Sequence, residues 1–185
     1  MRPLWRPAAA TYDGFVAHLD QAGAFPTYLP WPLSPGWEVT DFAVVGDERG
    51  ATATLTCVSG PSELDGPVDV LLVAEEAGVG LGARCAGTPG EDPGAELGQG
   101  PPEARLRIGS QPVPLWQVTW WGDGHANGEW DRSVVVGEAA GRWLWLVMRP
   151  ASAILLLHEE WQLRDVSGLG MALVELPFGG PHTRW

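Results

Sequence analysis

Residues 131–149 read Asp-Arg-Ser-Val-Val-Val-Gly-Glu-Ala-Ala-Gly-Arg-Trp-Leu-Trp-Leu-Val-Met-Arg, which is two strand-like runs joined at 138–141. Side chains alternate between the two faces of a strand. In the second run both faces are apolar, with Trp143, Trp145 and Val147 on one and Leu144, Leu146 and Met148 on the other. Such a strand needs cover on both sides, so we predict that it lies inside a sheet, at the centre of the core.

The length of 185 residues and the 45% hydrophobic content predict one domain with a single well-covered core. The 17 Pro and 25 Gly favour many short elements. We predict an α+β fold, with a largely antiparallel, twisted sheet and one or two covering helices. An all-β sandwich or barrel is the alternative. Residues 1–28 are expected to form a leader and a helix, and 29–185 the domain, with a flexible Gly, Pro and acidic loop at 87–102.

Periodicity and turn residues predict the individual elements. A helix is expected at 11–22, where Thr11 is a candidate N-cap and Gly23 a stop. The three prolines in 29–37 favour an extended segment. Residues 151–166 fit a helix or a strand, and we favour the helix. Strands are predicted at 38–45, 51–59, 68–74, 104–108, 113–121 and 171–176.

Charge restricts the classes of partner. The formal charge is −12, and every basic residue apart from histidine is Arg, with no cluster standing out along the chain. Such a chain repels phosphate backbones and anionic lipid, so we expect no nucleic acid and no membrane partner. A small molecule or a protein partner remains open, and a homodimer is possible. No apolar run approaches a membrane span and no secretory signal is visible, so a cytoplasmic location is expected.

Two segments formally match cofactor motifs. Residues 78–83 satisfy the dinucleotide pattern G-x-G-x-x-G/A, but 84–90 do not read as the required helix, so a turn into a short Gly-rich strand is predicted instead. Asp123 begins a calcium-loop match, but Val134 stands where a bidentate Glu is needed. We therefore favour a hairpin turn at Asn127–Gly128.

No other residues in the sequence indicate a metal or cofactor site. Cys57 and Cys85 lie in strand-like surroundings and read as small buried apolar residues. His158-Glu159-Glu160 fails the H-E-x-x-H zinc motif because residue 162 is Gln. We expect no metal and no cofactor.

The eleven Trp are the most unusual feature of the composition. Trp side chains fill cores or form contact surfaces. No nucleophile and base pattern appears, so we assign no catalytic residue and predict a non-enzymatic binding or protein-interaction module with a Trp-rich surface. The alternative is a small hydrolase-like enzyme in which the turn carboxylate of Glu138 acts as acid. The candidate ligand-lining residues are Trp31, Trp37, Glu75, Trp116, Trp120, Trp121 and Glu138.

A set of short motifs spans most of the chain from residue 29 onward: 30–37, 73–83, 114–116, 137–145, 163–165 and 176–177. As a set they resemble an uncharacterised family of small proteins from high-GC bacteria, a domain of unknown function. Members often begin with a zinc ribbon. Since no cysteine precedes Cys57, the resemblance implies no zinc here. It implies a fold and no catalytic activity.

Overall fold

The computed structural model describes residues 4–119, 131–158 and 161–185. Within these residues, ten strands form one mixed sheet in the order β1-β3-β4-β5-β9-β8-β7-β6-β10-β2. The strands are β1 (Leu4–Trp5), β2 (Tyr28–Pro30), β3 (Glu38–Asp47), β4 (Gly50–Ser62), β5 (Gly66–Glu75), β6 (Ala104–Ile108), β7 (Gln111–Gln117), β8 (Ser133–Ala139), β9 (Arg142–Arg149) and β10 (Gln162–Asp165). The helices are α1 (Tyr12–Ala22), α2 (Leu81–Ala86) and the 3-10 helices η1 (Ala151–His158) and η2 (Gly170–Glu175).

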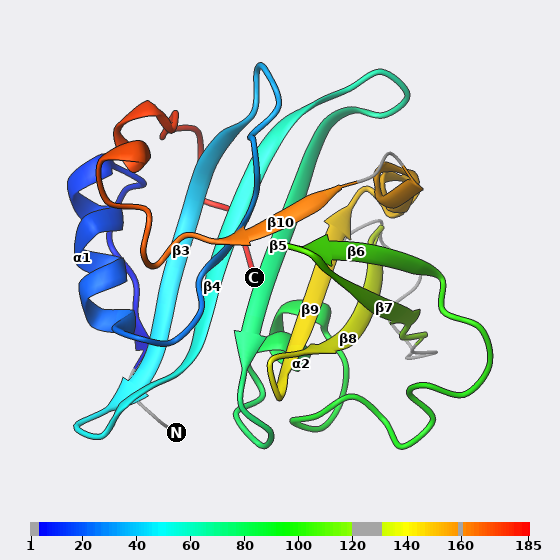
Figure 1. Cartoon of the computed structure of the whole chain (residues 1–185). Helices are drawn as coiled ribbons and strands as arrows, with labels where there is room; N and C mark the ends of the chain where they lie inside the picture. Colours follow the sequence, from blue (N-terminus) through cyan, green and yellow to red (C-terminus); the bar gives the residue numbers. More distant parts are fainter. Residues whose placement is uncertain (1–3, 120–130, 159–160) are drawn as a thin grey trace.

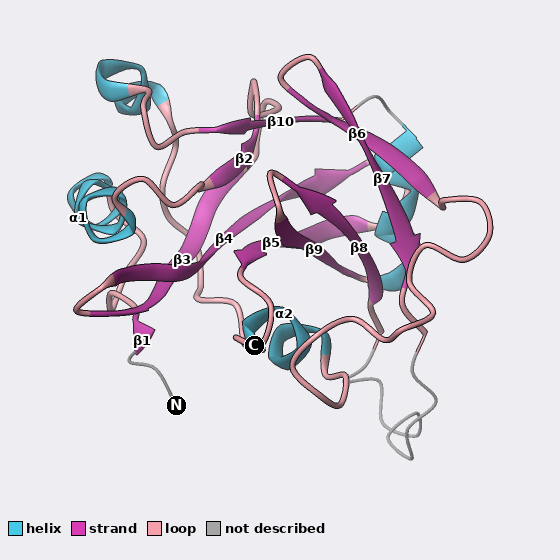
Figure 2. Cartoon of the chain, turned by 60° about the horizontal axis from the view of Figure 1, so that its bottom comes forward, coloured by secondary structure: helices cyan, strands magenta, loops and turns pink. Residues whose placement is uncertain are grey.

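The sheet folds back on itself, so that β10 and β2 lie over β4 and β5 (Figures 1 and 2). Two threonine hydroxyls of β4 join the layers: Thr54 donates to the carbonyl of Pro26 at 2.6 Å, and Thr56 donates to the carbonyl of Tyr28 at 2.7 Å. The β6–β10 pair is parallel, and the other strand pairs are antiparallel. The predicted sheet-dominated single domain is therefore confirmed.

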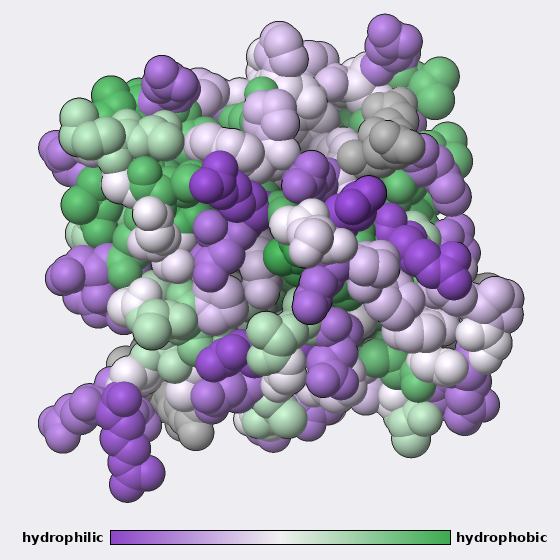
Figure 3. All heavy atoms as spheres, in the orientation of Figure 1, coloured by the Kyte–Doolittle hydropathy of each residue, from purple (hydrophilic) through white to green (hydrophobic). Residues whose placement is uncertain are grey.

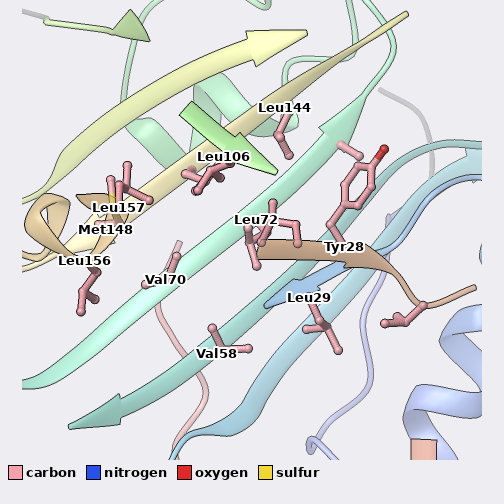
Figure 4. Close-up of a cluster of buried hydrophobic side chains, with 14 of the residues drawn as sticks. Tyr28, Leu29, Val58, Val70, Leu72, Leu106, Leu144, Met148, Leu156 and Leu157 are labelled. Atoms are coloured by element: carbon pink, nitrogen blue, oxygen red, sulfur yellow. The ribbon is translucent and has the colours of Figure 1, made fainter. Parts of the chain in front are cut away.

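The two-sided burial of β9 is confirmed. Leu144, Leu146 and Met148 belong to the core inside the fold of the sheet, whereas Trp145 and Val147 belong to a second core on the outer face. All five are fully buried, and only Trp143, at the start of the strand, is partly exposed. Figure 4 shows side chains from β2, β4, β5, β6, β9 and η1 converging on the inner core. Each buried side chain of this size contributes about 1.5–3 kcal/mol.

A two-residue turn joins β8 to β9. Ala140 and Gly141 occupy it with φ angles of 51° and 73°. Positive φ at both positions is the requirement of a type I′ turn, whose twist matches that of the flanking strands. The predicted hairpin at 138–141 is therefore confirmed, together with the helix at 11–22, which the Thr11 hydroxyl caps.

The outer core is covered by α2 and by the C-terminal residues. Gly82 makes the approach of α2 possible, because a Cβ there would lie 2.3 Å from the Trp145 ring. At the other end, the buried carboxylate of Asp41 accepts hydrogen bonds from the Arg6 guanidinium and, at 2.9 Å, from the Trp185 indole. The two ends of the chain are thus joined through one buried charge.

Three predicted elements are wrong. Residues 162–165 form β10 rather than the end of a helix, and residues 151–158 form a 3-10 helix. Residues 171–175 belong to η2 and Leu176 caps it, because no strand of the described residues pairs with this segment. Met171 is 83% exposed. The turn at 78–80 leads into α2 and not into a strand. Residues 87–102 contain neither helix nor strand, as expected for a loop.

Gly137 provides a test of the close approach of β7 and β8. A Cβ at this position of β8 would lie 2.2 Å from the carbonyl oxygen of Pro114 on β7. We expect Gly137→Ala to destabilise the protein by about 1–3 kcal/mol, because the two strands must separate. Urea unfolding measures this loss. Gly168→Ala is the control, since Gly168 has open space around its Cβ position. Equal stability of the two variants would contradict the close approach of β7 and β8.

Candidate interaction face

Strands β6 and β10 place three arginines on one exposed face. Along β6 the side chains of Ala104 and Leu106 are buried, while those of Arg105 and Arg107 are exposed. Along β10 Leu163 is buried and Arg164 is exposed. This alternation is typical of strands that cover a core on one side and face solvent on the other.

The parallel register brings the two strands into line. Gln162 lies opposite Arg107, and its carbonyl accepts a hydrogen bond of 2.9 Å from the amide of Trp31. A row of residues therefore runs across the sheet through Trp31, Gln162 and Arg107. With strands about 4.8 Å apart and about 3.3 Å per residue, the Cα atoms of Arg105, Arg107 and Arg164 fall within roughly 14 Å.

Two tryptophans flank these arginines. The Arg164 guanidinium lies 5.7 Å from the centre of the Trp31 ring, within the range of a cation–π contact. On the β7 side, Trp116 donates its indole N–H to the carbonyl of Gly100 at 3.2 Å. Both rings are partly exposed. We call the surface formed by Trp31, Arg105, Arg107, Trp116 and Arg164 the Arg–Trp face.

The Arg–Trp face carries unpaired positive charge in an acidic protein. None of its three arginines forms an ion pair with a described residue. The carboxylate of Asp165, which follows Arg164 in the chain, accepts from the amides of Thr27 and Ser167. Figure 3 views this side of the molecule and shows strongly hydrophilic residues gathered over β6 and β10. The protein therefore has a local basic surface although its net charge is −12.

The residues predicted to line a ligand do not share one site. Trp31 and Trp116 lie on the Arg–Trp face, whereas Trp37 is buried in the inner core. Trp120 and Trp121 fall outside the described residues.

The two predicted carboxylates lie on the outer face of the sheet. In β5, β9 and β8, Trp143 is paired with Glu75 on one side and Glu138 on the other. Glu138 is exposed and makes no hydrogen bond or ion pair with a described residue. Glu75 is fully buried. Because Trp143 lies between them in the sheet, Glu75 and Glu138 are not direct neighbours.

Glu75 holds α2 in place. Its Oε2 accepts from the amides of Leu81 at 2.7 Å and Gly82 at 3.1 Å. These are the first amides of the helix, which have no partner within it. They are also the groups that a pyrophosphate would need at the G-x-G-x-x-A motif, and the Glu75 carboxylate already occupies them. This side-chain contact explains why a six-residue helix forms where helical periodicity and capping residues did not predict one.

Burial raises the pKa of Glu75 to about 7, although the hydrogen bonds from Gly82 and Leu81 oppose the rise. Because the folded protein then binds more protons than the unfolded chain between about pH 4.5 and 7, stability falls as pH rises through that window. We expect Glu75→Gln to remove this loss, so the stability of the variant relative to the native protein rises from pH 4.5 to 7. Unfolding in urea across this range tests it. A difference that does not vary with pH would contradict the assignment.

The other buried titratable groups with shifted pKa values pack as core residues. His18 stacks on Phe15 with ring centres 5.3 Å apart, and burial lowers its pKa to about 3. Burial raises the pKa of the thiols of Cys57 and Cys85, to about 11 and 12, and both cysteines are free. Among the described residues, no group of His, Cys, Asp and Glu is placed to hold a metal ion.

Comparisons with known proteins identify a family. The model of a family of unknown function, DUF6758, matches residues 1–185, so the chain belongs to this family. No curated protein and no solved structure matches the chain. Within the described residues, no helix has both the length and the apolar character needed to cross a membrane.

Proposed function

We propose that this member of the DUF6758 family is a non-enzymatic protein-interaction module whose Arg–Trp face binds an acidic segment of a partner protein. The observation that carries the proposal is the unpaired set of Arg105, Arg107 and Arg164, brought together by the parallel pairing of β6 and β10. Guanidinium groups bind carboxylates through paired, charge-assisted hydrogen bonds.

The composition and shape of the face favour a protein partner. Arg and Trp are enriched among the residues that contribute most to binding energy at protein interfaces. The arginines stand on the solvent side of a sheet and not in a cleft, where small-molecule sites are usually found. The row from Trp31 to Arg107 would suit an extended segment with an apolar residue beside its carboxylates.

Charge also favours a short acidic segment over a larger polyanion. Nucleic acid or an anionic membrane extends beyond the face and meets the negative charge of the rest of the surface. A short segment needs only the local complementarity of the three arginines. The two free, buried cysteines are compatible with a reducing compartment, so we further propose that binding takes place in the cytoplasm.

Charge reversal on the face tests the proposal. We expect a short glutamate-rich peptide to bind the native protein at low salt, and Arg107→Glu to weaken binding by about tenfold or more, or about 1.4 kcal/mol. Fluorescence anisotropy of a labelled peptide measures the affinity. Arg49→Glu, in the exposed β3–β4 turn, changes the net charge equally and should leave binding within about twofold.

Two results would overturn this function. If Arg49→Glu weakened binding as much as Arg107→Glu, overall charge and not the Arg–Trp face would control affinity. If the native protein failed to bind acidic peptides but bound single-stranded nucleic acid through the same arginines, the partner would be a polyanion and not a protein.

A further inference from the structure

A separate groove lies at the end of the folded sheet. Its walls are the segment that follows β2, the turn between β4 and β5, and η1 together with Trp161. These segments lie in the upper part of Figure 1. The cavity volume is about 460 Å³. This falls within the range of small-molecule sites in proteins.

Two tryptophans form a corner in this groove. The rings of Trp37 and Trp161 are 5.6 Å apart and inclined at 78°. Trp37 lies flat against the backbone of β4, since a Cβ on Gly60 would be 2.3 Å from its ring. Trp161 is partly exposed. The two rings pack edge to face, with Trp37 buried, so the aromatic surface open to the groove is supplied mainly by Trp161.

The charge of the groove has one sign. Its lining includes Glu63 and Asp65 and no Arg or Lys. The hydroxyl of Ser152 donates to Asp65, which ties the β4–β5 turn to the start of η1. Leu64 and Leu155 add apolar surface and are 77% and 49% exposed. The lining therefore combines aromatic rings, aliphatic side chains and carboxylates.

We infer that this groove binds a small organic cation, of the alkylammonium or quaternary ammonium class. The faces of aromatic rings attract cations through the ring quadrupole, and desolvation strengthens the attraction. The carboxylates of Glu63 and Asp65 match the positive charge, and the leucines match an alkyl body. A neutral molecule would gain nothing from the negative charge of Glu63 and Asp65, and an anion would be repelled by it.

Calorimetric titration with choline tests the inference, with 3,3-dimethylbutan-1-ol as the uncharged molecule of the same shape. We expect choline to bind at least about tenfold more tightly than the alcohol. Trp161→Leu should weaken choline binding by about tenfold, whereas Trp161→Tyr, which keeps a π face, should retain most of it. Glu48→Gln, in the β3–β4 turn, is the control for loss of one negative charge and should leave choline binding unchanged.

Should Trp161→Leu fail to fold, Asp65→Asn replaces it, with an expected loss of about threefold or more, and circular dichroism checks the fold. Equal affinity for choline and the alcohol, or no choline binding at all, would overturn the inference. Acidic-peptide binding should be unaffected by these groove variants, so the two proposals fail independently.

Discussion

The two apolar faces of β9 impose the shape of the molecule. Each face of the strand must pack against another part of the protein, because both carry apolar side chains. On the inner side the sheet supplies its own cover by folding back, so that Leu106 of β6 and Leu163 of β10 reach the same core as Leu144. On the outer side α2 and the C-terminal residues cover Trp145 and Val147. No large helical layer is needed, and the helices are correspondingly small.

This arrangement creates both the Arg–Trp face and the groove near Trp161. Folding the sheet over its own inner face turns the outer sides of β6 and β10 toward solvent, where the two strands carry three exposed arginines. The same fold leaves an open end near Trp37 and Trp161, where the groove lies. On the outer side, the first turn of α2 lies against the carboxylate of Glu75.

The sequence predicts local features well and long-range ones poorly. The alternation in 143–148 identified the central strand, and Thr11 and Gly23 marked the ends of α1, because these signals act over a few residues. The short strand β10 depends on β6 and β2 as partners, and α2 depends on the carboxylate of Glu75. The partners of β10 lie more than fifty positions away, and although Glu75 is close to α2 in the chain, no sequence pattern marks its carboxylate as the acceptor for the amides of Leu81 and Gly82.

The Arg–Trp face could not be predicted from the sequence for the same reason. Arg105 and Arg107 are separated from Arg164 by more than fifty positions, and only the parallel pairing of β6 with β10 unites them. The alternation Ala-Arg-Leu-Arg-Ile at 104–108 was the one available signal, since it exposes both arginines on one face of a strand.

The most direct measurement is a titration of the isotopically labelled protein with an acidic peptide, followed by two-dimensional amide NMR. The account predicts that amides of β6 and β10 shift together, with the indole N–H of Trp31, while those of the β3–β4 turn remain unchanged. Shifts confined to α2 and the C-terminal residues, or spread evenly over the surface, would contradict it.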